Sequence, residues 1–255
     1  MFTFKDAYSA KFYFDRLRAS NSLLFDSHYN ICEAVIKNAY IVQRVLESVI
    51  QKKQLIILDL GSGNGHLSRL LCQLTDSICY GFDPKTNLST RLRNYKLNFR
   101  NIINNKAGRV YASKMNHKKF FEKYGRKYDV IFDNCSVTHF NTTKNLDTNM
   151  GWSFMAENMQ NYLVDGGKYI CSTDICVGDK IKSEFCFENE ILNLFTTNGW
   201  MVHSQNIINQ PSEFTSLAKF FNDFLKFNFL RVPPLGAIDG QALGITGFVA
   251  EKNNI

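Results

Sequence analysis

The sequence has no apolar run long enough to cross a membrane, and its N-terminus, Met1–Asp6, lacks the apolar core and cleavage site of a secretory signal. We therefore expect a cytoplasmic protein without a membrane span. Seven cysteines form no C-x-x-C pair and no zinc-type spacing, which excludes a zinc-ribbon site and favours reduced thiols. The remaining composition, with 45% hydrophobic and 21% charged residues, is ordinary for a globular chain that can bury a substantial core.

Net charge is the one compositional hint of an anionic partner. The chain carries +7 at pH 7, and the basic residues gather in two segments, 91–100 and 114–127. The first segment has Tyr95 and Phe99 between its cations, a pattern that can bind nucleic acid. Because the charge is modest and intermixed with acids, we expect a solvated helix face here and no nucleic-acid partner.

The most informative segment is residues 55–66, where an apolar run of strand length ends in Asp59 and is followed by Gly61, Gly63 and Gly65. Glycines after a buried strand allow a tight turn and a close approach of backbone to a ligand. The helix expected to follow points its free N–H groups into the same space. A second short strand, 77–83, ends in Asp83, where a carboxylate can accept both ribose hydroxyls.

The loop departs from the dinucleotide pattern in two ways. The spacing G-x-G-x-x-G would need glycine at His66, and the charge of Asp59 would repel a pyrophosphate. That charge favours a cationic ligand without phosphate. The sequence D-x-G-x-G-x-G, followed by a strand that ends in Asp, resembles the class I S-adenosylmethionine-dependent methyltransferases. The resemblance implies that the loop, Ser62 included, passes under the methionine part of the cofactor and that Asp83 binds its ribose.

Strand-like and helical segments alternate along the chain, which predicts an α/β fold with a doubly wound, mostly parallel sheet. The helices are expected at 31–50, 84–95, 115–124, 151–163 and 187–195. The strands are expected at 55–59, 77–83, 102–103, 128–133, 168–173, 201–208 and 245–250. The resemblance covers about residues 53–252 and implies a Rossmann-like, seven-stranded methyltransferase sheet, with the last strand antiparallel and entering by a hairpin from the sixth.

Two regions outside the regular alternation are expected to shape the substrate side. Residues 1–52 are interpreted as an N-terminal helical cap, and 53–255 as the methyltransferase domain. A phenylalanine-rich helical insertion, 210–241, precedes the last strand, and we expect it to pack over the open edge of the sheet; lying on a membrane surface is the alternative. Ligands of open α/β sheets bind at the carboxyl ends of the strands, so the cap and the insertion should form the substrate wall.

In the methyltransferases that this chain resembles, the segment after the fourth strand touches both cofactor and acceptor. Here Asp133 and Asn134 are expected at the cofactor, and His139 is the candidate general base, because the ordinary pKa of histidine lies near neutrality. Packing against the cofactor is the alternative role for His139. The adenine contact expected after the third strand would come from Asn104 or Asn105.

The expected function is methyl transfer from S-adenosylmethionine to a small molecule, most simply to a hydroxyl of a sugar or other metabolite. The segment after the fourth strand lacks the proline-proline-aromatic sequence of enzymes that methylate base amino groups, and Cys135 has no adjacent proline, which argues against nucleic acid as acceptor. An RNA methyltransferase and a catalytically idle cofactor-binding subunit remain the alternatives. No metal is expected, although Asp133, Asp174 and Asp179 could offer oxygen ligands.

Overall fold

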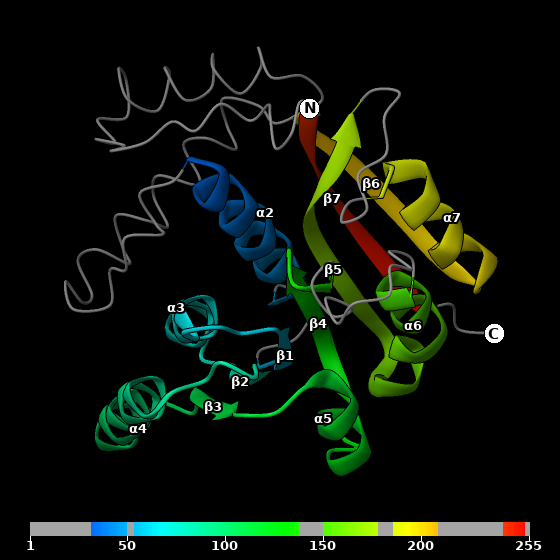
Figure 1. The fold of residues 1–255 in the computed structure, drawn as a ribbon. Coiled ribbons are helices and arrows are strands. Elements are labelled where there is room, and N and C mark those ends of the chain that lie inside the picture. The colour runs from blue at the N-terminus through cyan, green and yellow to red at the C-terminus, as the bar shows by residue number, and fades with distance from the viewer. Residues whose placement is uncertain (1–31, 50–53, 138–149, 178–185, 209–241, 253–255) are drawn as a thin grey trace.

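The computed structural model describes residues 32–49, 54–137, 150–177, 186–208 and 242–252, which form a seven-stranded sheet flanked by helices (Figure 1). The strands are β1 (Ile56–Leu60), β2 (Ile78–Phe82), β3 (Arg109–Ser113), β4 (Tyr128–Asn134), β5 (Leu163–Val177), β6 (Trp200–Ile208) and β7 (Ala242–Lys252). The helices are α2 (Cys32–Val49), α3 (His66–Thr75), α4 (Leu88–Ile103), α5 (His117–Lys123), α6 (Met150–Asn158), the short η4 (Met159–Tyr162) and α7 (Glu188–Thr197).

The strand order is β3-β2-β1-β4-β5-β7-β6, which confirms the doubly wound, mostly parallel sheet. Strands β1 to β5 run parallel, whereas β7 lies antiparallel between β5 and β6. The chain leaves β1 toward β2 and β3, then returns to place β4 on the other side of β1. This switch point puts the carboxyl ends of β1 and β4 side by side, which is where open α/β sheets bind ligands.

The two helical layers are built from different parts of the chain. Helices α2, α3 and α4 cover one face of the sheet, and α5, α6 and α7 cover the other (Figure 1). The predicted N-terminal helix is confirmed as Cys32–Val49, while residues 1–31 and the insertion 210–241 lie outside the described residues. Among the described helices, none is long and apolar enough to cross a membrane.

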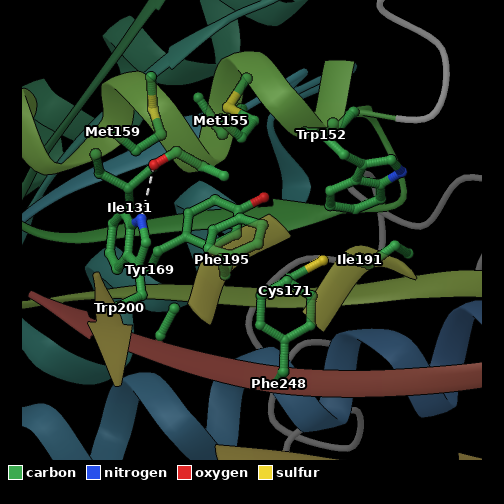
Figure 2. Packing of buried hydrophobic residues seen from close by; sticks show 14 of the residues in the cluster. Ile131, Trp152, Met155, Met159, Tyr169, Cys171, Ile191, Phe195, Trp200 and Phe248 are labelled. Carbon is green, nitrogen blue, oxygen red and sulfur yellow. Dashed lines mark hydrogen bonds between the residues drawn. The ribbon is translucent and has the colours of Figure 1, made fainter. Parts of the chain in front are cut away.

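The core beneath α6 and α7 fixes the strands that carry the site. The Tyr169 ring on β5 stacks on Phe195 of α7, with ring centroids 5.3 Å apart, and Phe248 of β7 completes the cluster (Figure 2). Trp200 donates its indole N–H to the Ala156 carbonyl, 2.8 Å away, so its one polar atom is satisfied inside the cluster. Large, fully buried rings of this kind hold β4 and β5 in a single register.

Helix α2 is fitted to the opposite face of the same strands. The Tyr40 ring lies flat on Gly247 of β7, where an added Cβ would come within 2.5 Å of the ring. The contact leaves no room for a side chain at position 247. It places the first half of α2 against the carboxyl end of β5, beside the predicted site.

The prediction of a third strand at 102–103 is wrong. Ile102 and Ile103 form the last turn of α4, which continues eight residues beyond its predicted end, and the third strand is Arg109–Ser113. Two adjacent isoleucines have strand propensity, but both side chains here are more than half exposed. The true strand is held at the sheet edge partly by a side chain, because Asn98 accepts from the Val110 N–H at 2.8 Å and donates to the Val110 carbonyl at 2.9 Å.

Candidate cofactor and acceptor site

The glycine loop turns between β1 and α3 as the sequence predicts. Gly61, Gly63 and Gly65 all have positive φ, between 48° and 68°, a region that side chains strongly disfavour. The Gly65 N–H donates to the Ser62 carbonyl at 2.6 Å, and Ser62 donates its own N–H to the Phe82 carbonyl of β2 at 2.9 Å. A Cβ added at Gly63 would meet nothing within 4 Å, so the loop presents bare backbone to open space.

Close packing on two sides sets the position of this loop. A Cβ at Gly61 would lie 2.3 Å from the Ser136 Cβ, so the segment after β4 rests directly on the loop. On the other side, a Cβ at Gly81 of β2 would lie 2.7 Å from Ser62. Gly81 was not among the predicted site residues, and its only sequence signal is its place two residues before Asp83.

Asp83 is joined directly to the glycine loop. Its carboxylate accepts the Gly63 N–H at 3.0 Å and the Lys85 N–H at 2.5 Å. The side chain is only half-buried, which leaves room for an approaching hydroxyl. The two acids predicted from the sequence, Asp59 and Asp83, therefore lie at the ends of neighbouring strands around one turn.

Asp59 lies underneath the loop rather than in its opening. The residue is buried, and its carboxylate accepts a 2.5 Å hydrogen bond from the Ser68 hydroxyl of α3. Burial raises the pKa of Asp59 to about 7; the Ser68 hydrogen bond lowers it, and the charges of Asp133 and Asp83 raise it. At this depth Asp59 can act on a ligand through its charge and through the position of α3.

Asp133 holds the segment after β4. Its carboxylate accepts the Ser136 N–H at 2.8 Å and the Val137 N–H at 3.3 Å, and the Ser136 hydroxyl lies between this carboxylate and the Leu60 carbonyl oxygen. The side chain is fully buried. Burial raises the pKa of Asp133 to about 6, although the hydrogen bonds from Ser136 and Val137 lower it. Through these hydrogen bonds, Asp133 holds Ser136 in contact with Gly61.

Three carboxylates thus meet at the carboxyl ends of β1, β2 and β4. Asp133 and Asp83 both raise the pKa of Asp59, so their charges are close enough to interact with it. The buried guanidinium of Arg69 in α3 lies at the same loop and lowers the pKa of Asp59. When the three carboxylates are ionised, their charge exceeds that of this guanidinium, and the net negative charge repels phosphate and attracts a cation. The site is therefore suited to a positively charged group held without phosphate contacts.

Asn134 and Ser62 each have a buried polar atom at this edge for which the described residues provide no hydrogen-bond partner. The Asn134 amide donates to the Asn38 side chain of α2 at 2.6 Å, but its own Oδ1 accepts no hydrogen bond. The Ser62 hydroxyl is likewise buried and unsatisfied. Buried polar groups are nearly always paired, so such atoms at the mouth of a loop indicate a missing ligand or water.

A second polar cluster, which the sequence did not predict as a unit, joins the carboxyl ends of β4 and β5 to α2. Lys37 of α2 donates to the Asp174 carboxylate of β5 at 3.1 Å, and both side chains are largely buried. The Cys135 thiol donates to the same carboxylate at 3.0 Å, and burial raises the pKa of this thiol to about 12. The cluster joins α2 to β5 and to Cys135, the first residue after β4.

The remaining predicted residues fall into three groups. His139 and Asp179 lie outside the described residues. Asn104 and Asn105 follow the end of α4, at the amino ends of the strands, so neither can reach this site and the predicted adenine contact is wrong. Within the described ranges no cluster of His, Cys, Asp and Glu could hold a metal ion, and the Lys37 ammonium already pairs with Asp174.

Comparison with known proteins establishes the fold. No model of a protein family and no curated protein sequence matches the chain. Among solved structures, a protein from Galdieria sulphuraria provisionally assigned as a sarcosine dimethylglycine methyltransferase shares 14% identity over 85% of each chain, with a TM-score of 0.55. Phosphoethanolamine N-methyltransferase 2 from Haemonchus contortus, in complex with S-adenosylhomocysteine, shares 14% identity over 83% of this chain, with a TM-score of 0.56; the match spans about half (53%) of that structure.

The fold alone does not decide the reaction. The [4+2]-cyclase SpnF matches as well as the methyltransferases do, with 12% identity over 86% of this chain and 81% of its own, and a TM-score of 0.53. The chain therefore has the Rossmann-like methyltransferase fold, and its chemistry must be argued from the site.

The buried carboxylate of Asp59 makes a testable contribution to stability. Its folded pKa lies above the ordinary value, so the folded protein holds that proton more tightly, and stability is lost as pH rises from about 4 to about 7. Asp59→Asn keeps a hydrogen-bond acceptor for Ser68 and removes this loss. Urea titrations at pH 5 and pH 8 give the free energy of unfolding of both proteins. The value for the variant minus the value for the parent should be about 2 kcal/mol larger at pH 8 than at pH 5.

The control is Asp165→Asn, which removes an exposed carboxylate at a distant edge of the sheet. Its stability relative to the parent should change by less than about 0.5 kcal/mol over the same pH range. If the difference in free energy of unfolding between Asp59→Asn and the parent does not change with pH, ionisation of Asp59 does not destabilise the folded protein.

Proposed function

We propose that this protein is an S-adenosylmethionine-dependent methyltransferase that acts on a small molecule. The main support for the proposal is that three carboxylates lie close together next to a glycine turn whose backbone is not covered by side chains. A nicotinamide or flavin dinucleotide would bring a pyrophosphate into that negative field. S-adenosylmethionine brings a positively charged sulfonium, an ammonium group and no phosphate.

The residues around the turn fit the parts of this cofactor. The half-buried carboxylate of Asp83 is the acceptor for the ribose hydroxyls, and the backbone from Gly61 to Gly65 borders the methionine part. The orphaned Ser62 hydroxyl and Asn134 Oδ1 supply one hydrogen-bonding group on each side of the opening. When bound, the cofactor supplies a methyl group on a sulfonium sulfur, which is open to direct displacement by a nucleophile.

Asp59 and Asp133 are positioning residues in this proposal. Asp59 fixes α3 through Ser68, and Asp133 fixes the segment after β4 through the Ser136 and Val137 N–H groups. Their charges also favour a cation over a neutral ligand in the opening. Holding acceptor and methyl in line is the main task of a protein in a direct displacement, so rigid loop positions contribute directly to the rate.

The acceptor is proposed to lie between the segment after β4 and the start of α2. Lys37 and Asp174 close the end of this space, and Asn134 Oδ1 can accept a hydrogen bond from a bound hydroxyl or amine. His139, in the segment that follows, remains the candidate base for an acceptor hydroxyl such as that of a sugar or other metabolite. Inside a cell, reduced thiols such as Cys135 would persist in the form that this cluster requires.

The donor assignment is tested by Asp83→Ala. Loss of the ribose hydrogen bonds to a charged acceptor should weaken S-adenosylmethionine binding by about 2 kcal/mol, or roughly thirtyfold, in isothermal titration calorimetry. Asp165→Ala, which removes an exposed acid elsewhere, should bind as the parent does. An Asp83→Ala variant with parental affinity would refute the ribose assignment, and a parent that binds no S-adenosylmethionine would refute the function.

The acceptor assignment is tested by the double variant Lys37→Gln/Asp174→Asn, which removes both charges but can keep the hydrogen bond. We expect its S-adenosylmethionine Kd to change by less than about twofold, while kcat/KM for release of S-adenosylhomocysteine falls about tenfold or more because the acceptor wall is altered. The acceptor is found first by screening sugar and metabolite hydroxyls with the parent protein.

The matched control is Lys252→Gln/Asp165→Asn, an exposed pair of the same two residue types with a 3.0 Å separation. It should retain parental kcat/KM. If the Lys37/Asp174 variant also keeps parental kcat/KM, the acceptor does not lie against this pair. If the parent binds the cofactor yet releases no S-adenosylhomocysteine with any acceptor, RNA included, the protein is an idle binding subunit.

A further inference from the structure

Helix α4 is inverted: its polar side faces the protein and its apolar side faces outward. Thr90, Asn94 and Asn101 are buried. Asn94 accepts from the Arg69 guanidinium at 2.8 Å, and Asn101 donates to the Gly108 carbonyl at 2.8 Å. Asparagines that satisfy strand and loop backbone groups thus replace the leucines that normally anchor a surface helix to its sheet.

The outward side of α4 is a continuous apolar stripe. From Leu88 to Ile102 its members follow one another by three or four residues, and Ile103 lies four residues after Phe99, which is the spacing of a single helix face. Their exposed fractions are 71% for Leu88, 51% for Leu92, 67% for Tyr95, 55% for Phe99, 56% for Ile102 and 64% for Ile103. Single exposed apolar residues are ordinary, but a stripe along a 16-residue helix marks an interaction surface.

Cations border the stripe on both sides. At 100° per residue, Arg91 lies along one edge, and Lys96 and Arg100 lie along the other; the helix also carries Arg93 and no acidic residue. In the part of the chain that the structure describes, none of the four cations pairs with a carboxylate. Their charge is therefore available to a partner.

The same end of the molecule carries most of the positive charge of the protein. Residues 84–128 contain 13 lysines and arginines and a single acid, Glu122, whereas the rest of the chain contains 17 basic and 22 acidic residues. The net charge of +7 is therefore the sum of +12 in residues 84–128 and −5 in the rest of the chain. The expectation that the cations of segments 91–100 and 114–127 are intermixed with acids is wrong for this part of the chain. This segment forms α4, the edge strand β3 and α5, which lie together along one end of the fold (Figure 1).

The partner must carry negative charge and must also offer an apolar region in which the leucine and isoleucine side chains of α4 can be buried. A second copy of this chain would set four cations against four more, so like charges oppose pairing of α4 with itself. Single-stranded RNA would use the rings of Tyr95 and Phe99 but leave the leucines and isoleucines in water. An aromatic and aliphatic face bordered by arginine and lysine is the pattern of helices that lie in the surface of an anionic membrane.

We propose that α4 docks this protein on an anionic lipid surface. The apolar stripe enters the boundary between headgroups and acyl chains, and the bordering cations contact lipid phosphates and carboxylates. The site for cofactor and acceptor lies at the carboxyl ends of the strands, so this docking is independent of the proposed activity.

The test is sedimentation of the full-length protein with vesicles of phosphatidylcholine, with and without phosphatidylserine. The parent should bind the phosphatidylserine vesicles at least tenfold more tightly, and added sodium chloride should weaken that binding. Leu92→Ser/Phe99→Ser and Arg91→Gln/Arg100→Gln should each reduce binding about tenfold or more. Met201→Ser, which removes an exposed apolar residue from β6, should bind as the parent does.

A second readout does not depend on loss of binding. Leu92→Trp should show a blue shift of tryptophan emission on addition of phosphatidylserine vesicles, because the new ring enters the lipid boundary, while thermal melting verifies that each variant is folded. Absence of vesicle binding by the parent, or equal binding to both vesicle types, overturns the proposal. A stripe variant that turns a parental dimer into a monomer, or a parent that binds single-stranded RNA and not vesicles, overturns it in favour of those partners.

Discussion

The structure depends on how three carboxylates are accommodated at one edge of the sheet. Asp59, Asp83 and Asp133 end neighbouring strands, and the first and last of them are buried. A buried, ionised carboxylate costs several kcal/mol unless it is hydrogen-bonded, which is comparable with the whole stability of a domain. Each carboxylate therefore organises its surroundings: Ser68 and α3 around Asp59, the Gly63 N–H around Asp83, and the segment after β4 around Asp133.

The rest of the fold supports this arrangement from a distance. The rings of Tyr169, Phe195 and Phe248 hold β5, α7 and β7 together on one face. Tyr40 fits α2 against Gly247 on the other. The close contact between Gly61 and Ser136 fixes the position of the glycine loop after β1 relative to the residues after β4.

Local sequence patterns were sufficient to predict the glycine loop and its flanking elements, and insufficient to predict the cluster of Lys37, Cys135 and Asp174. Buried strands, glycine spacing and the two acids are signals within about thirty residues of chain; they predicted β1, α3 and β2, and the structure places Asp83 beside the glycine loop. The ion pair between Lys37 and Asp174 joins residues that are 137 positions apart, and no local sequence pattern predicts such a contact. The third strand was misplaced because Ile102 and Ile103 have strand-like side chains on a helix whose apolar face points outward.

The central claim, that the three carboxylates select a cation, is tested most directly by comparing S-adenosylmethionine with S-adenosylhomocysteine across pH. The two ligands differ by one methyl group and one positive charge on sulfur. Because the pKa values of Asp59 and Asp133 are about 7 and about 6, both lose protons as pH rises through this range. The ratio of the two affinities, measured by calorimetry, should rise severalfold in favour of S-adenosylmethionine from about pH 5 to pH 7.5, and less in Asp59→Asn. A ratio that is independent of pH in the parent protein would contradict the account.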